Sequence, residues 1–286
     1  MRGFLLIDKA AGLSSFDVIR QLRKITGIKR IGHCGTLDPF ATGLLICALG
    51  SYTRLNSLLE AREKSYQATL RLGQSTTTGD PEGEVEETAS PNIERFDASA
   101  ITAAALALQE LPVPKYSAVK IQGQRAYKLM RQGVEVEIAP RAVQVHSFQF
   151  LNPEELSEQN PYLSYACTVS KGTYIRSLSI WIAAQMQTVA HTVSLRRTAI
   201  GDISVDAAVR LDEMTDWQSA LVPCEKLFGY IPSKRLDAEQ IRVLQHGQSV
   251  AVDMVDAERI LVLNDMREIE TLGYIKDGNL HPKVNF

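Results

Sequence analysis

The sequence predicts an α+β fold with a mixed sheet, followed by a second, smaller β-rich domain. The chain has 286 residues, close to the length at which one hydrophobic core gives way to two. Strand-like and helix-like stretches alternate without the regular spacing of a parallel, doubly wound sheet. From about residue 230 the pattern changes to one short helix followed by strands. We therefore expect two domains, over residues 1–228 and 229–286.

The N-terminal segment predicts a strand and then a helix. Residues 4–8 predict a short strand whose first four residues are apolar, and the next apolar positions recur at helical spacing. A serine pair can cap this helix, Asp17 favours its first turn, and Gly27 is suited to end it. The face expected to pack against the core contains Val18, Ile19, Leu22 and Ile25.

The next elements follow from similar patterns. A glycine-rich loop over residues 32–43 precedes a buried strand over 44–50 and a short helix over 53–63. Residues 64–73 alternate between apolar and polar, which indicates a half-buried strand. An alanine-rich helix is expected over residues 97–111.

The second half of the chain begins with a disrupted segment and then becomes regular. Residues 112–142 are rich in cations and broken by prolines and glycines. A glycine turn at residues 171–172 opens a helix, and residues 193–205 predict a pair of strands. A short helix within residues 236–250, ended by Gly247, is followed by strands around the hairpin signal Asp277-Gly278.

Composition indicates a protein of the reducing cytoplasm. Hydrophobic residues make up 45% of the chain, enough for a core without disulfides. The four cysteines fit no zinc spacing, so we expect reduced core residues and no metal. The first apolar run is too short for a signal peptide, and no apolar run is long enough to cross a membrane. The net charge of −2 argues only weakly against a nucleic-acid partner, because the charge is unevenly distributed.

One loop concentrates conformationally special residues around a single carboxylate. The stretch GHCGTLDPFATG contains three glycines, a proline, a histidine and a cysteine beside Asp38. Pro39 favours extended backbone at Asp38, and the glycines allow close approach of backbone or ligand. The residues alone leave two interpretations: a turn capped by Asp38, and a loop that presents a catalytic carboxylate.

Six stretches occur in the order of a known family's motifs. They are LLIDKAAGLSS, GHCGTLDPFATGLL, KSYQATLRLGQSTTTGD, PKYSAVKIQGQRAYKLMRQG, CTVSKGTYIRSL and SLRRTAIG. Together they resemble the TruB family of tRNA pseudouridine synthases over nearly the first 210 residues. The resemblance implies a catalytic domain with a mixed, mainly antiparallel sheet flanked by helices. It also implies that the tail is the small, β-rich, PUA-like RNA-binding domain of bacterial members.

The resemblance implies an isomerase that converts uridine to pseudouridine at position 55, in the T-loop of tRNA. This reaction breaks the bond from ribose C1′ to N1 and joins C1′ to C5, which requires no cofactor. Asp38 is implied as the catalytic nucleophile or base. Arg176 is implied as its ion-pair partner, which favours the charged carboxylate. On the residues alone, Arg176 is equally well explained as a solvent-facing helical residue.

Four further residues are implied to bind the substrate base. Tyr66 is implied to stack on the flipped uracil, Leu195 to pack against it, and Tyr174 to line the same pocket. His33 is implied to fill the gap that the extruded base leaves. Without the resemblance, Tyr66 and Leu195 are explained as core residues and His33 as a residue that shapes its loop.

The basic insertion over residues 112–142 is implied to grip the RNA backbone. Cations there can neutralise phosphates, although a charged run is also typical of a solvated surface. Lys64 is a further candidate for phosphate contact, and Lys9 suits either that role or folding of the N-terminal loop. The acidic stretch over residues 79–97 is expected to be solvated and remote from the RNA-binding face. The insertion cations expected at the backbone are Lys115, Lys120, Arg125, Lys128 and Arg131.

Other functions remain open on the residues. A non-catalytic folding chaperone for tRNA would use the same surface, and a metal hydrolase would need more ligands than His33 and Cys34. A pseudouridine synthase of a guide-RNA particle is a further alternative, but the short N-terminus favours a stand-alone bacterial type. We expect a monomer with the T-arm of tRNA as its partner and no obligate protein partner.

The chain departs from the family pattern at three positions. Ala10 stands where proline usually follows the motif lysine, Cys34 where threonine is common, and Met130 where alanine is usual. None of these is a residue that the resemblance places in the catalytic step, so we expect activity to be kept.

Overall fold

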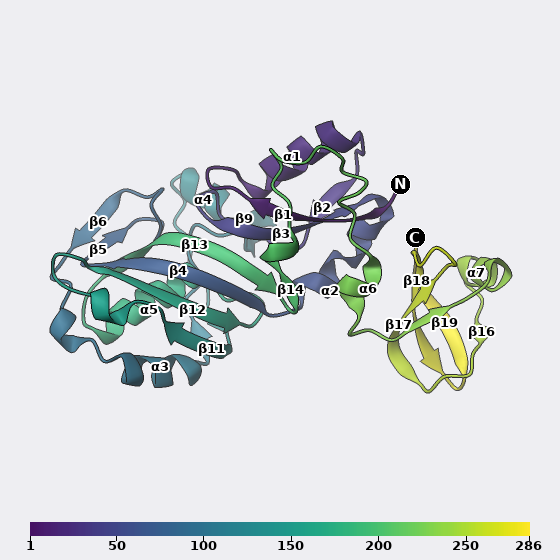
Figure 1. Ribbon diagram of the computed structural model, residues 1–286. Coiled ribbons are helices and arrows are strands. Elements are labelled where there is room, and N and C mark those ends of the chain that lie inside the picture. Colours follow the sequence, from purple (N-terminus) through teal and green to yellow (C-terminus); the bar gives the residue numbers. More distant parts are fainter.

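The computed structural model describes residues 1–286 and contains two main sheets (Figure 1). The larger sheet has eight strands in the order β1-β3-β13-β4-β12-β11, with β2 beside β3 and β14 beside β13. Only the β3–β13 pair is parallel, which confirms the prediction of a mixed, mainly antiparallel sheet. The strands are β1 (Gly3–Lys9), β2 (Ile31–His33), β3 (Thr42–Leu49), β4 (Lys64–Leu72), β11 (Val145–Phe150), β12 (Tyr162–Val169), β13 (Ala190–Ile200) and β14 (Ile203–Ser204).

Local signals explain the first helix, α1 (Ser15–Thr26). Ser14 caps it and forms a capping box with Asp17, and Gly27 ends it in the left-handed region at φ 70°. Three of the four predicted core residues are buried, whereas Ile25 in the last turn is 39% exposed. The apolar face therefore ends one turn earlier than its spacing predicts.

The remaining helices cover the sheet or connect its strands. A 24-residue apolar cluster joins the long helix α5 (Ile175–Gln185) and α3 (Ala98–Leu106) to the strands β4, β12 and β13. The helix predicted over residues 97–111 is shorter in the structure: α3 ends at Leu106, and the strand β7 follows it. The shorter elements here are η1 (Gly50–Leu55), α2 (Asn56–Glu60), β5 (Gln74–Thr76), β6 (Val85–Thr88), η2 (Ile93–Arg95), β7 (Glu110–Leu111), η3 (Pro153–Glu155), η4 (Val205–Ala207) and α6 (Cys224–Phe228).

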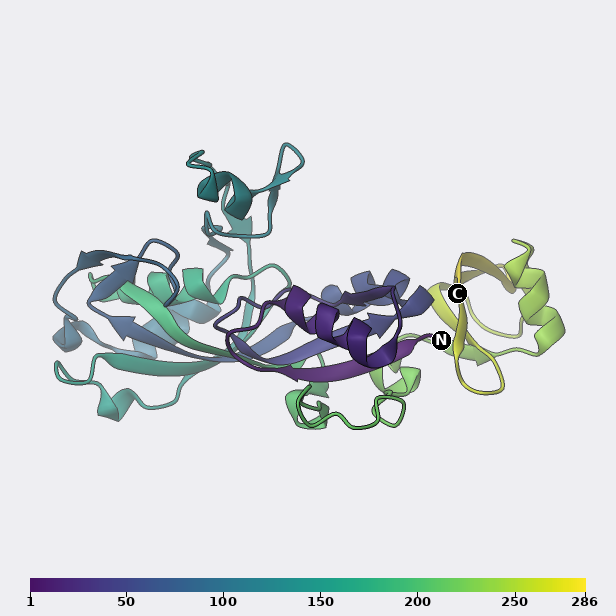
Figure 2. The same ribbon diagram turned by 90° about the horizontal axis from the view of Figure 1, so that it is seen from above.

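The basic insertion projects from the sheet as a separate lobe (Figure 2). Its base is tied to the body, because β10 pairs with β7. Its tip is a two-residue hairpin turn with positive φ at Gln122 and Gly123. The elements of the lobe are β8 (Lys120–Ile121), β9 (Gln124–Arg125), α4 (Ala126–Arg131) and β10 (Arg141–Ala142).

A five-stranded sheet forms the C-terminal part, in the order β15-β17-β18-β19-β16. The predicted hairpin between β18 and β19 turns at Asp277 and Gly278, both with positive φ. Because no strand of the larger sheet lies beyond Ser204, we propose that the C-terminal domain begins near residue 229. Its elements are β15 (Ser233–Arg235), α7 (Ala238–Gln245), β16 (Val250–Ala251), β17 (Ala257–Leu263), β18 (Ile269–Lys276) and β19 (Asn279–Asn285).

The two parts share a packed joint. Leu261, Leu263 and Ile269 of the C-terminal sheet belong to the same apolar cluster as Phe4 and Tyr52. The Ile269 main-chain N–H donates to the Tyr52 hydroxyl at 2.7 Å. None of the helices combines the length and the apolar content needed to cross a membrane.

Candidate active site

Asp38 lies in the loop between β2 and β3, and this loop is held at its centre by two side chains. The Ser15 hydroxyl accepts from the Leu37 N–H at 2.9 Å and lies 3.1 Å from the Leu37 carbonyl. The Lys9 ammonium donates to the Pro39 carbonyl at 3.2 Å. The Asp38 side chain keeps 34% of its surface exposed, so the loop presents this carboxylate to solvent.

Arg176 joins four segments that are distant in sequence. Its Nε lies 3.0 Å from Asp38 Oδ2, and its Nη1 lies 3.2 Å from Asp80 Oδ2. Its Nη1 also donates to the Thr78 carbonyl at 2.7 Å, and its Nη2 to the Tyr116 carbonyl at 2.9 Å. Because only 3% of the side chain is exposed, these contacts fix the guanidinium beside Asp38. The structure thus excludes the solvent-facing interpretation of Arg176.

Asp80 corrects the expectation that the acidic stretch is wholly solvated and remote. The residue is 3% exposed, and its Oδ1 accepts from the Glu82 N–H at 3.0 Å and from the Thr78 hydroxyl. The acidic residues over 82–87 are exposed, as predicted. The high negative charge of the whole stretch favoured a solvated loop, so the sequence did not predict that Asp80 is buried. The three threonines and the glycine directly before Asp80 were the available signal of a structured turn.

The electrostatics of Asp38 reflect two opposing influences. Burial raises the pKa of the Asp38 carboxyl above its usual range, and the neighbouring Asp80 charge acts in the same direction. Arg176 and Lys9 oppose this shift because their positive charges favour the carboxylate. The ion pair therefore favours the charged form at a site where burial disfavours it.

Tyr66 and Leu195 lie in the apolar cluster that also contains Leu37 and Ala41 of the Asp38 loop. They are 8% and 6% exposed, so both are packed residues as well as neighbours of the loop. Burial raises the pKa of the Tyr66 phenol, which therefore stays neutral near pH 7. Tyr174 is half-buried at the start of α5, two residues before Arg176.

His33 and Cys34 have different surroundings although they are adjacent. The His33 Nδ1 is buried without a hydrogen-bond partner, and burial together with nearby arginines lowers the pKa of the imidazole. Cys34 is fully buried, its thiol lies 3.4 Å from Asn56 Oδ1, and burial raises its pKa. It is therefore an unreactive packing residue. No three His, Cys, Asp or Glu side chains converge in a geometry suited to a metal ion.

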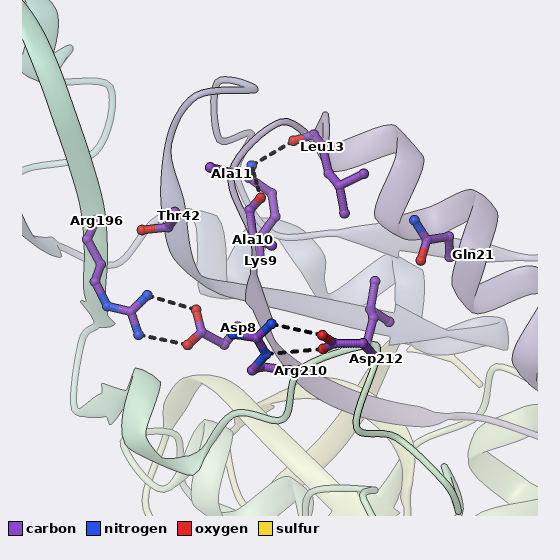
Figure 3. Close-up of a pocket in the computed structure, with 11 residues that line it drawn as sticks. Asp8, Lys9, Ala10, Ala11, Leu13, Gln21, Thr42, Arg196, Arg210 and Asp212 are labelled. Atoms are coloured by element: carbon purple, nitrogen blue, oxygen red, sulfur yellow. Dashed lines mark hydrogen bonds and ion pairs between the residues drawn. The ribbon is translucent and has the colours of Figure 1, made fainter.

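Lys9 and Lys64 do not have the exposure that a phosphate contact requires. Lys9 is 1% exposed and donates to the carbonyls of Ala10 and Leu13 (Figure 3). It also donates to the Pro39 carbonyl, and these three contacts support the loop-folding role. Lys64 is 7% exposed and donates to the carbonyls of Glu60 and Arg62. Burial lowers the pKa of each ammonium to about 8.

The five predicted insertion cations lie in the projecting lobe, and none of them forms an ion pair with Asp38. Lys115 forms an exposed ion pair with Glu135 at 3.2 Å, and the Arg131 guanidinium lies over the Tyr127 ring. Arg125 donates to the Ala118 carbonyl at 3.2 Å. Lys120 and Lys128 have no ion-pair partner closer than 4 Å. The lobe therefore carries cations that remain available to an anionic partner.

A separate pocket lies beside β1, and its two arginines are already paired with its two aspartates (Figure 3). Arg196 and Asp8 form a bidentate pair at 2.9 and 2.7 Å, and Arg210 and Asp212 form another at 3.1 and 2.8 Å. Because Asp38, Tyr66 and Arg176 are not among its lining residues, we do not assign the active site to this pocket.

Comparisons with solved structures support the fold. The chain resembles a Cbf5 chain of a Cbf5-Nop10-Gar1 complex with a TM-score of 0.69 and 22% identity, covering 99% of this chain and 84% of that one. It also resembles a chain of an H/ACA ribonucleoprotein bound to a substrate RNA, with a TM-score of 0.68 and 20% identity, covering 99% and 84% respectively.

Comparisons with sequences identify the family. Residues 23–175 match the model of the TruB family pseudouridylate synthase N-terminal domain. The chain is 39% identical to the tRNA pseudouridine synthase B of Thermobifida fusca, over 87% of this chain and 86% of that protein. It is 38% identical to the protein of that name from Nitrosococcus oceani, over 90% and 85%. This chain therefore belongs to the TruB family of pseudouridylate synthases.

Proposed function

We propose that the protein isomerises uridine to pseudouridine at position 55, in the T-loop of tRNA. The observation that carries the proposal is the Asp38–Arg176 ion pair at 3.0 Å, placed next to the cluster that contains Tyr66 and Leu195. The relatives named tRNA pseudouridine synthase B support tRNA as the substrate. The resemblance of the Asp38 loop to the TruB family motif supports the T-loop position.

The chemistry requires one carboxylate and no external electron source. The bond from C1′ to N1 breaks, a bond from C1′ to C5 forms, C5 loses a proton and N1 gains one. Asp38 starts this exchange by attack on the nucleoside or by removal of a ribose proton. Arg176 keeps the carboxylate charged and oriented, because it is buried and bonded to three other segments.

The substrate base has to leave its stack before it reaches Asp38. Extrusion of a base costs a few kcal/mol, which contacts with the protein must offset. In the proposal Tyr66 stacks on the uracil, Leu195 packs against it and Tyr174 lines the pocket. In the same proposal His33 occupies the space that the base leaves.

RNA binding is assigned to the projecting lobe together with the C-terminal domain. Lys115, Lys120, Arg125, Lys128 and Arg131 lie on the lobe and would neutralise phosphates. In the proposal the enzyme works in the cytoplasm as a monomer, without a cofactor or an obligate protein partner.

The test uses purified protein and an unmodified tRNA transcript. We expect pseudouridine at position 55 and none when that uridine is replaced by cytidine. Pseudouridine at another position would overturn the T-loop assignment, and none in any tRNA transcript would overturn tRNA modification. In cells that lack the protein, mapping should show uridine at the same position.

A further inference from the structure

The buried side chain of Arg197 on β13 lies beneath the Asp38 loop and is absent from the predicted site. Arg197 is 1% exposed and has no carboxylate partner; its guanidinium donates to main-chain carbonyls and also lies against the Tyr66 hydroxyl. Its Nε donates to the Leu44 carbonyl at 2.7 Å, and its Nη2 donates to the Gly35 carbonyl at 3.0 Å.

These two carbonyls lie on opposite sides of Asp38 in the sequence. One guanidinium therefore ties together the beginning and the end of the loop that carries the carboxylate. Gly43 pairs with Arg197 in the sheet and has φ +100°; a Cβ there would lie 2.2 Å from the Arg197 carbonyl oxygen, so this end of the loop packs directly against the Arg197 main chain. Gly35 has φ +88°, a conformation that favours glycine, and its carbonyl lies at the other end of the loop.

The fold alone gives no reason for an arginine at this position. Burying a cation without a carboxylate partner costs several kcal/mol, and an apolar side chain of similar volume would avoid that cost. The neighbouring Arg196 shows the ordinary arrangement, because it is 37% exposed and paired with Asp8. What distinguishes Arg197 is its grip on two carbonyls that a hydrophobic side chain cannot bind.

We propose that Arg197 is a positioning residue that fixes Asp38 by clamping both ends of the loop over residues 35–44. Its catalytic consequence rests on the proposed function, whereas the clamp itself does not. Ser15 and Lys9 hold the middle of the loop at Leu37 and Pro39, so Arg197 supplies the restraint that these two side chains do not.

The Arg197→Lys variant separates the clamp from the buried charge. A lysine keeps the cation but is a point donor on a flexible stem, so it does not reproduce the two-carbonyl fork. We expect a folded protein that binds tRNA as the wild type does. Its single-turnover rate should fall by about 100-fold, the effect expected of a misplacement near 1 Å. Arg196→Gln is the matched control and should keep the wild-type rate.

Hydrogen exchange provides a readout that does not depend on activity. Amides over residues 35–44 should exchange faster in Arg197→Lys than in the wild type, while those of β12 stay protected. Unchanged exchange together with an unchanged rate would overturn the proposal. So would a rate loss that only follows lost tRNA binding or global unfolding. If the wild type makes no pseudouridine, the proposed function fails and the exchange experiment still decides the clamp.

Discussion

At the scale of single residues, the site depends on how one buried arginine divides its contacts. Arg176 faces two carboxylates, Asp38 and Asp80, and also donates to two main-chain carbonyls. The contact with Asp80 thereby restrains rotation of the guanidinium and holds it in one orientation beside Asp38. The resemblance to the family motifs predicted the roles of Asp38 and Arg176. No local signal in the sequence predicted that Asp80 pairs with Arg176.

Replacing Arg176 with glutamine should change the pH profile as well as the rate. In the proposed mechanism the reaction needs ionised Asp38, so kcat/KM should rise as pH increases through the pKa of this carboxyl. Burial already raises that pKa and Arg176 lowers it, so the variant's acid limb should move to higher pH. An acid limb that stays in place, measured from pH 4.5 to 8 with about half-unit steps, would contradict this account.

At the scale of elements, the proposed function gives the projecting lobe and the sheet separate tasks. The lobe carries cations at the end of a narrow base, whereas β13, β4 and α5 position the side chains around Asp38. Substitutions in the lobe should therefore alter RNA affinity and leave the chemical step unchanged once tRNA is saturating.

Replacing Lys120 and Lys128 together with glutamine should weaken tRNA binding and reduce its salt dependence. Each lost phosphate contact lowers the slope of log K against log salt by about 1, so the double variant should lose about 2. Binding titrations at several salt concentrations measure this slope. Arg95→Gln, on η2 outside the lobe, is the control. An unchanged slope in the double variant would remove these lysines from the RNA contact.

Elements with local signals could be predicted, and contacts set by strand register could not. The capping box of α1, the alternation of β4 and the Asp277-Gly278 hairpin were all evident in the sequence. Arg197 and Asp80 were missed because their partners lie more than 90 residues away along the chain. Lys64 was misplaced because exposure was inferred from charge, although its ammonium is held by two carbonyls.

At the scale of the whole molecule, the C-terminal sheet is fixed to the catalytic part by a polar and an apolar contact. Tyr52 lies in the shared apolar cluster and accepts a hydrogen bond from the Ile269 N–H. Arg2 pairs with Glu268 at 3.2 Å and with Glu270 across the same joint. The distance between Asp38 and the C-terminal domain is therefore set by packing rather than by a flexible linker.

Replacing Tyr52 with phenylalanine should weaken this joint while leaving its apolar packing nearly unchanged, because only the hydroxyl is removed. The buried Ile269 N–H loses its acceptor, which should lower the free energy of unfolding by about 1–3 kcal/mol. Urea unfolding measures the change, and Tyr162→Phe, at the exposed first residue of β12, is a control expected to show little effect. Equal stability of Tyr52→Phe and the wild type would show that the joint does not depend on this bond.

The central claim is that Asp38 performs the chemistry at a site whose other residues bind and orient. The most direct measurement is pseudouridine formation in a tRNA transcript by purified Asp38→Asn protein, with tRNA binding measured in parallel. The account predicts no detectable pseudouridine, with tRNA binding and thermal unfolding close to those of the wild type. Pseudouridine formed by the pure variant at the wild-type rate would contradict it.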